Sequence, residues 1–217
     1  MPKKINLLVT AGPTREMLDP VRFLSNVSTG NMGYETAKQG ARMGFRVTLI
    51  SGPTALGRPK NVRFIPVVSA AQMKEAILRE WKKTDILIMT AAVCDYTPVR
   101  FSPSKIKRIK QRTIRFKRTE DILELVGKKK AGRILVGFAL ETENWEQNAV
   151  RKLRKKNLDY IVANWYGRGN YPFGTGRTSM VLMDRSGAKK LLSHVTKVNA
   201  SKFILSELRR RWNTKNS

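Results

Sequence analysis

Short apolar runs alternate with helix-forming segments along this chain, and that alternation constrains its fold more than any other feature. The runs are rich in β-branched residues and apolar at successive positions, which is typical of strands covered on both faces. They read INLLVT, FRVTLIS, VRFIPVV, DILIMTAAV, TIRFKR, ILVGFAL, DYIVANW and SMVLMD. Helices are expected between them, over residues 33–43, 70–82, 120–130, 143–157 and 197–212. The pattern predicts an α/β fold with a mostly parallel, twisted sheet and helices on both faces.

A chain of 217 residues, 41% of them hydrophobic, is long enough to bury one substantial core. We therefore expect a single Rossmann-like domain over residues 1–217. Gly-Pro at 12–13 and at 52–53 should end the first two strands. Eight basic residues and no acid lie between Lys105 and Arg118, which predicts a basic flap over about 97–118 with an antiparallel strand. The last residues, RRRWNTKNS, are expected to fray.

Cysteine content and charge narrow the setting of the protein. Its one cysteine, Cys94, allows no internal disulfide, which fits a reducing, cytoplasmic compartment. The first apolar run is too short for a signal peptide or a membrane span, so no membrane partner is expected. The net charge of +27 indicates affinity for polyanions. Nucleic acid, a phosphorylated small substrate and a merely solvated basic surface are all compatible with that charge.

The stretch SNVSTGNMG, residues 25–33, lies between the first predicted strand and the first predicted helix. A helix N-terminus offers unpaired N–H groups and partial positive charge, so it attracts phosphate or carboxylate. Gly30 and Gly33 would let a ligand approach the backbone, and Ser28 adds a side-chain donor. The dinucleotide pattern G-x-G-x-x-G is absent, and no Gly-Lys-Ser/Thr of a P-loop follows. A phosphate site and a simple capped helix both remain open.

A second candidate, MTAAVCDY at residues 89–96, ends the fourth apolar strand. Loops at the carboxyl ends of parallel strands commonly hold ligands. Ala91 and Ala92 leave room there, and Asp95 could accept hydrogen bonds from a base or a sugar or could simply cap the strand. Cys94 and the only histidine, His194, are far apart in the sequence. We therefore interpret both as packing residues, and no Cys–His nucleophile is predicted.

Lysines supply the third candidate. The segment KIKR, residues 105–108, could close over a triphosphate or could blunt an exposed strand edge. Lys152 and Lys156 are four residues apart and share one face of a predicted helix. Two like charges at that spacing lower the stability of the helix by about 0.3 kcal/mol, and an anionic ligand bound between them would remove that repulsion.

Taken together, these segments resemble one enzyme family. The stretches VTAGPTREMLDPVRFLSNVSTGNMG, AAVCDY, KIKR, RTEDIL, GFALETEN and RKLRKKNLDYIVAN occur in this order over most of the chain. They are similar to phosphopantothenate–cysteine ligase of coenzyme A biosynthesis, in its bacterial, CTP-dependent type. Many bacteria fuse this ligase behind a flavin-dependent decarboxylase. Because nothing precedes the first strand in this sequence, a free-standing ligase is expected.

The resemblance implies a reaction in two steps. The carboxylate of 4′-phosphopantothenate attacks the α-phosphate of CTP and gives an acyl-cytidylate and pyrophosphate. The amine of L-cysteine then displaces CMP. Mg²⁺ assists, through ligands that the sequence does not identify, and no protein nucleophile is required. The family also implies a homodimer.

Residue roles carry over from the resemblance by position. Asn26 would contact the acyl-cytidylate, Lys105 would close over it from the flap, and Arg22 would reach a substrate phosphate across the dimer interface. The further substrate-binding residues implied are Ser28, Gly30, Ala91 and Ala92. The nucleotide-binding residues implied are Gly12, Met89, Asp95, Lys105, Glu120, Asp121, Ile122, Leu123, Phe138, Lys152 and Lys156.

Departures from the family keep two other hypotheses open. RTEDIL stands where Lys-Asn-Pro-Asp-Ile-Leu is commoner, and Arg108 stands in place of lysine. The +27 charge is also higher than the family leads us to expect. One alternative is an NADP-dependent Rossmann oxidoreductase, against which the missing glycine fingerprint argues. The other is a basic nucleic-acid-binding α/β protein, although aromatic residues for base stacking are scarce in the basic run.

Overall fold

One twisted sheet organises the chain, seen in a computed structural model that describes residues 4–108, 113–167 and 169–216. Within those residues the sheet has eight strands in the order β12-β11-β10-β9-β6-β1-β4-β5. The strands from β10 to β5 in this order run parallel to one another, whereas β11 runs antiparallel to both of its neighbours, β10 and β12. The predicted mostly parallel sheet is therefore confirmed. Its strands are β1 (Asn6–Ala11), β4 (Arg46–Ser51), β5 (Arg63–Pro66), β6 (Ile86–Met89), β9 (Ile134–Glu141), β10 (Tyr160–Trp165), β11 (Thr178–Asp184) and β12 (Lys189–Val195).

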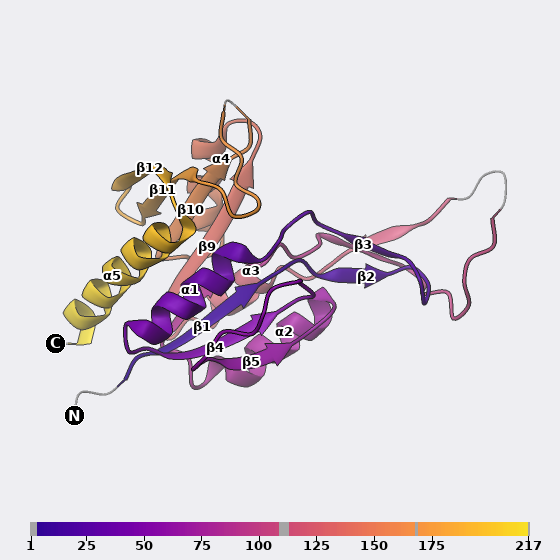
Figure 1. Cartoon of the computed structure of the whole chain (residues 1–217), viewed down its shortest axis with the longest axis horizontal. Helices are drawn as coiled ribbons and strands as arrows, with labels where there is room; N and C mark the ends of the chain where they lie inside the picture. The colour runs from indigo at the N-terminus through magenta and orange to yellow at the C-terminus, as the bar shows by residue number, and fades with distance from the viewer. Residues whose placement is uncertain (1–3, 109–112, 168, 217) are drawn as a thin grey trace.

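Helices cover both faces of the sheet, as predicted (Figure 1). Side chains alternate between the faces along each strand. Leu8 and Leu87 therefore belong to one core cluster, and Leu7 and Ile88 belong to the other. The cluster with Leu8 packs under α2 (Ala70–Trp81), α3 (Ile122–Lys128) and α4 (Trp145–Lys155), and the cluster with Leu7 packs under α1 (Asn31–Arg42) and α5 (Lys197–Asn216).

No helix among the described residues has the length and apolar character needed to cross a membrane.

An arm of two short antiparallel pairs projects from the body (Figure 1). The hairpin of β2 (Arg15–Met17) and β3 (Phe23–Ser25) forms one pair, and β7 (Tyr96–Pro98) with β8 (Phe116–Arg118) forms the other. The second pair closes the base of the predicted flap, and the antiparallel strand expected there is confirmed as β8. Residues 109–112 of that flap lie outside the described residues.

The C-terminal prediction was wrong. Helix α5 continues to Asn216 instead of ending at residue 212 and fraying. Two contacts hold its last turns: Thr214 Oγ1 donates to Arg210 O at 3.1 Å, and Lys215 Nζ donates to Gly132 O at 2.6 Å. The hairpin β2–β3 and the strand β12 were not predicted, because their residues show no apolar run.

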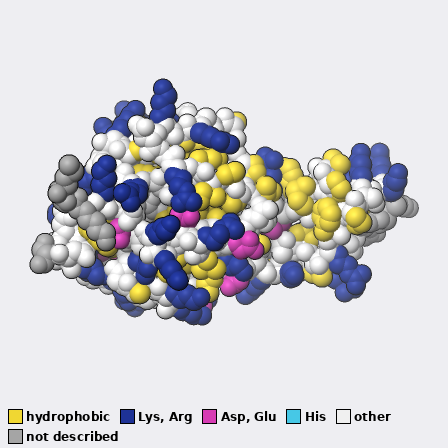
Figure 2. Space-filling model, turned by 90° about the horizontal axis from the view of Figure 1, so that it is seen from below, with side chains coloured by type: hydrophobic (Ala, Val, Ile, Leu, Met, Phe, Trp, Pro, Cys, Tyr) yellow, Lys and Arg dark blue, Asp and Glu magenta, His cyan; other side chains and the backbone are white. Residues whose placement is uncertain are grey.

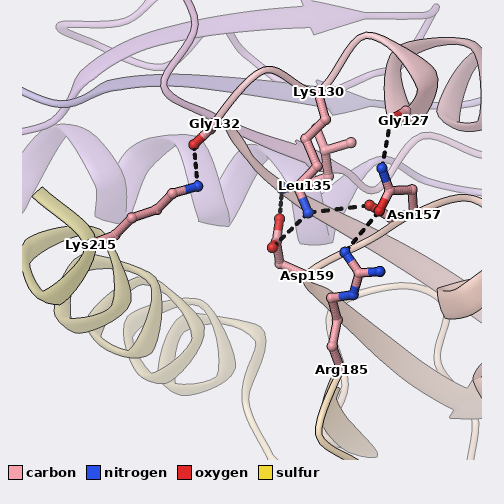
Figure 3. Close-up of polar contacts among 8 residues, drawn as sticks. All are labelled: Gly127, Lys130, Gly132, Leu135, Asn157, Asp159, Arg185 and Lys215. Atoms are coloured by element: carbon pink, nitrogen blue, oxygen red, sulfur yellow. Dashed lines mark hydrogen bonds and ion pairs between the residues drawn. The ribbon is translucent and has the colours of Figure 1, made fainter.

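A network of polar contacts closes the amino end of the sheet next to β9 and β10 (Figure 3). Lys130 Nζ donates to Asp159 Oδ1 at 2.7 Å, and Asp159 Oδ2 accepts from the Leu135 N–H at 2.8 Å. Asn157 Nδ2 donates to Gly127 O at 2.9 Å, and its Oδ1 accepts from Arg185 at 2.8 Å. These bonds join the loop after α3, the loop after α4 and the turn after β11, so they fix that rim internally.

Candidate functional site

A cleft of about 850 Å³ opens at the other rim, at the carboxyl ends of β6, β9 and β10. Its walls come from segments far apart in the sequence: the turn before α1, the loop after β6, the start of α3, one face of α4, and the first residue of α5. Parallel α/β sheets generally place their ligands at this rim. The cleft is therefore the candidate site.

Most residues singled out from the sequence line this cleft. They are Asn26, Ser28, Met89, Ala91, Ala92, Asp95, Glu120, Asp121, Leu123, Phe138, Lys152 and Lys156. Gly30 lines a smaller adjoining recess, and Ile122 is buried in the core. Gly12 packs so closely that a Cβ there would lie 2.9 Å from Gly52 O. Arg22 and Lys105 belong to the arm and do not line the cleft.

A long-range hydrogen bond holds Asn26 in place. Its Nδ2 donates to Ala92 O at 3.0 Å, which joins the segment before α1 to the loop after β6. Cys94, in that loop, is 4% exposed, and its N–H donates to Thr14 Oγ1 at 2.9 Å. Burial raises the pKa of the Cys94 thiol, which disfavours the reactive thiolate. The predicted packing role of Cys94 is confirmed, whereas the same prediction for His194 was wrong, because His194 is exposed on β12.

The N-terminus of α1 forms one wall of the cleft. Gly30 is its N-cap with a left-handed φ of 80°, and no acidic residue occupies its first turn. A Cβ at Gly33 would lie 2.5 Å from both Ala11 Cβ and Thr90 Oγ1, so glycine is required for α1 to approach the ends of β1 and β6 this closely. The first N–H groups of a helix have no partner inside it. This wall therefore presents backbone donors and partial positive charge.

The two predicted lysines, Lys152 in α4 and Lys156 at its C-cap, are both in ion pairs. Lys152 Nζ lies 2.6 Å from Glu141 Oε1, and Lys156 Nζ lies 2.8 Å from Asp121 Oδ2. These pairs are partly exposed, with 38% of the Lys152 side chain and 40% of the Asp121 side chain accessible. Exposed pairs contribute about 0–1 kcal/mol, so an anionic ligand could displace the acids at low cost.

Sequence reasoning missed one wall of the cleft, the wall beyond β9. Lys197, the first residue of α5, is 6% exposed, and its Nζ has no hydrogen-bond partner among the described residues. Burial lowers the pKa of Lys197. The Oδ1 atom of Asn164 is likewise buried without a partner in that part of the chain. The missed residues are Asn164, Pro172, Phe173, Thr178, Met180 and Lys197.

For a cation the cleft offers little on its own. No group of three or more His, Cys, Asp or Glu side chains that could hold a metal ion is found in the described ranges. Asp95 is exposed and lines the cleft, and no ion pair of its carboxylate is found in those ranges. Mg²⁺ commonly binds through one or two carboxylates together with substrate phosphates. Asp95 is therefore a candidate to provide one carboxylate ligand to such an ion.

Comparison with known proteins gives a consistent result. The family model described as "DNA/pantothenate metabolism flavoprotein C-terminal domain" matches residues 3–211. The chain is 46% identical over 205 residues to the coenzyme A biosynthesis bifunctional protein CoaBC of Bacillus subtilis, covering 94% of this chain and 50% of that protein. It is 38% identical over 219 residues to the CoaBC of Escherichia coli, covering 99% of this chain and 54% of that protein.

A solved structure extends the match to three dimensions. The C-terminal domain of a CoaBC protein superimposes with a TM-score of 0.83 at 37% identity, covering 97% of this chain and 96% of that one. The chain therefore spans about half the length of the curated relatives, and it covers 96% of the separately solved C-terminal domain of a CoaBC protein.

Proposed function

This chain belongs to the family of the DNA/pantothenate metabolism flavoprotein C-terminal domain, and we propose from that premise that it joins 4′-phosphopantothenate to L-cysteine in coenzyme A biosynthesis. The observation that carries the proposal is the cleft, which brings together Asn26, Asp95, Lys152 and Lys156 from three separate segments. Amide, carboxylate and ammonium groups in one cleft suit a substrate acid and a nucleoside triphosphate. CTP is the proposed nucleotide.

In the first step, a carboxylate oxygen of phosphopantothenate attacks the α-phosphorus of CTP. The bond from that phosphorus to the pyrophosphate oxygen breaks, and pyrophosphate leaves with the electron pair. Lys152, Lys156 and the first turn of α1 balance the phosphate charge, so catalysis is mainly positioning and charge stabilisation. Mg²⁺ held near Asp95 would supply further charge neutralisation on the phosphates.

In the second step, the cysteine nitrogen attacks the acyl carbon of the cytidylate. The carbon–oxygen bond to CMP breaks, and the amine gives up one proton to the solvent. Asn26 is the residue proposed to orient the acyl phosphate, because Ala92 O fixes its amide at the mouth of the cleft. No nucleophilic side chain takes part, in keeping with the buried state of Cys94.

The arm supports the proposal of a homodimer. Its exposed apolar side chains include Val21 at 59%, Val99 at 47% and Phe101 at 55% accessibility. Figure 2 shows hydrophobic side chains gathered along the arm. Exposed apolar patches of this kind usually mark an interface. We propose that a second copy packs there and that Arg22, also on the arm, reaches a substrate phosphate in the partner's cleft.

Contacts between the two parts of the arm bear on the flap residue Lys105. The Ile106 N–H donates to Asp19 Oδ2 at 3.1 Å, and Arg22 Nη2 donates to Ile106 O at 3.1 Å. Burial raises the pKa of Asp19, but hydrogen bonds from the N–H groups of Val21, Ile106 and Arg22 outweigh it, and the pKa is lowered. An ionised Asp19 therefore anchors the base of the flap, from which Lys105 is proposed to close over the intermediate.

A pyrophosphate-release assay tests the proposed function. The protein is mixed with 4′-phosphopantothenate, Mg²⁺ and each nucleoside triphosphate in turn, with and without L-cysteine. We expect CTP to be preferred, limited pyrophosphate release without cysteine, and continuous release with formation of the amide when cysteine is present. Absence of amide product with every nucleotide would reject the proposal.

The two alternative functions make different demands. An NADP-dependent oxidoreductase would bind NADPH and not CTP. A nucleic-acid-binding protein would bind in a steeply salt-dependent way. Lys and Arg are spread over the body on the face shown in Figure 2 and do not form a single stripe, so we do not propose a specific nucleic-acid partner.

We also propose a cytoplasmic location. The single cysteine, which is buried and free, is compatible with a reducing compartment.

A further inference from the structure

Lys197 is the one buried charged residue of the cleft wall that has neither a hydrogen bond nor an ion pair within the described part of the chain. Its side chain is buried, and Nζ has no hydrogen-bond partner among the described residues. Burying an ammonium group without a counter-charge is costly, and the cost normally selects against such an arrangement. An anion bound in the cleft would supply the counter-charge that this ammonium group lacks.

The surroundings of Lys197 indicate where that anion would bind. The residue faces a recess whose other wall is the turn 28–33 at the start of α1. Lys197 also stands at the start of α5, where a helix dipole disfavours a cation. Neither α1 nor α5 has an acidic residue in its first turn. Two helix N-termini and one ammonium thus meet without any acid of their own, which is the chemistry of an anion site.

We propose that Lys197, together with the first turn of α1, binds the terminal phosphates of the nucleoside triphosphate and so selects a triphosphate over a monophosphate. The inference rests on the proposed function for the identity of the nucleotide. The α-phosphate must stay within reach of Asn26 and the substrate carboxylate, and the β- and γ-phosphates then extend toward the recess. When the bond from the α-phosphorus breaks, the Lys197 ammonium stabilises the charge that remains on pyrophosphate, and no proton transfer is needed.

Binding of small anions tests the role of Lys197 directly. Calorimetry is carried out with inorganic pyrophosphate, CTP and CMP, without Mg²⁺ so that the ammonium group has no competing cation. We expect Lys197→Met to weaken pyrophosphate and CTP about tenfold or more, the size of one lost charge-assisted hydrogen bond. CMP affinity should change less than about twofold, because CMP lacks the terminal phosphates. Lys197→Arg should retain part of the affinity for pyrophosphate.

Lys202→Met is the matched control, because Lys202 is an exposed lysine of the same helix. It should bind all three probes as the wild type does. Equal pyrophosphate affinity in the wild type and in Lys197→Met, or an equal loss for CMP and CTP, would overturn the inference. Thermal unfolding of each variant shows that it is folded.

The inference and the proposed function can fail separately. If the wild type makes no amide product, yet pyrophosphate binding still depends on Lys197, the ligase proposal fails and the anion site stands. If the amide forms normally in Lys197→Met with an unchanged KM for CTP, the ligase proposal stands and the role of Lys197 is rejected.

Discussion

Two largely buried lysines lie at opposite rims of the same sheet, and they differ in what balances their charge. At the amino end, Lys130 contacts Asp159 Oδ1 at 2.7 Å and Asn157 O at 3.3 Å (Figure 3). At the carboxyl end, Lys197 has no such partner among the described residues. The lysine at the amino-end rim is neutralised by a partner within the protein, whereas we infer that the lysine at the carboxyl-end rim is neutralised by a bound anion.

The same contrast extends to neighbouring residues. At the amino end, Asp85 Oδ2 accepts from both the N–H and the Nδ2 of Asn6, at 2.8 and 2.9 Å. At the carboxyl end, Lys152 and Lys156 pair with acids that are themselves partly exposed. Substitutions at the amino rim should therefore lower stability and leave activity intact, and substitutions at the carboxyl rim should impair ligand binding or activity without destabilising the protein.

Asn26→Asp at the carboxyl rim should have the largest effect. The carboxylate cannot donate to Ala92 O, and its charge opposes the acyl phosphate. Loss of one donor of this kind typically costs about a hundredfold in rate. We expect amide formation to fall by about that factor while pyrophosphate release from CTP continues, as followed by parallel assays of the two products.

Asn61→Asp controls for the change of charge, because Asn61 is exposed on the loop before β5 at the amino end. It should retain both activities. If Asn26→Asp slows both steps equally, the role assigned to Asn26 in the second step is wrong.

Lys130→Met tests the amino rim. Removing one partner from a buried ion pair costs about 3–5 kcal/mol, and the cost should be nearer about 2 kcal/mol here because both side chains keep some exposure. Urea unfolding should show that loss with wild-type turnover. Lys128→Met, a change in a lysine whose side chain is 72% exposed, should be neutral. An unchanged midpoint for Lys130→Met would contradict the structural role of this rim.

Lys197→Met should raise the stability of the protein, whereas Lys130→Met should lower it. Removing a buried, unpaired charge should stabilise the ligand-free protein by about 1 kcal/mol. Because burial lowers the pKa of Lys197, the folded state binds this proton less tightly than the unfolded state does. Wild-type stability should therefore rise with pH between the lowered folded pKa and the unfolded value of about 10.4. Thermal unfolding across that range should show a smaller rise in Lys197→Met, and identical slopes would contradict this assignment.

Much of this fold follows from local sequence. Ile86–Met89 is fully buried on both faces, as its unbroken apolar run predicts. Helix α2 begins at Ala70, as predicted, because Ser69 and Gln72 form a capping box there. The missed strands are of another kind. The hairpin β2–β3 has three-residue strands, and β12 is mostly exposed, so neither carries a periodic apolar signal.

The cleft divides in the same way. The walls that were predicted carry segments with a local sequence signal, such as the glycine-rich turn before α1 and the lysines Lys152 and Lys156. The wall containing Lys197 depends on contacts across the whole chain: Thr36 Oγ1 and Ser201 Oγ, 165 residues apart, lie 3.2 Å from each other where α1 and α5 pack. A single lysine among 43 basic residues has no local feature that marks it as buried.

Among the variants of the two rims, Lys152→Gln should have the smallest effect on stability. It therefore separates a role in ligand binding from a role in folding most clearly. Its ion pair with Glu141 is short, at 2.6 Å, but 38% of the lysine side chain is exposed, so unfolding should shift by less than about 0.5 kcal/mol. CTP affinity should nevertheless fall about tenfold, because the lysine would exchange Glu141 for phosphate. Arg154→Gln, an exposed change on the same helix that does not line the cleft, should alter neither quantity. If Lys152→Gln destabilises the protein and spares CTP binding, its pair with Glu141 is structural, and the carboxyl rim resembles the amino rim at that position.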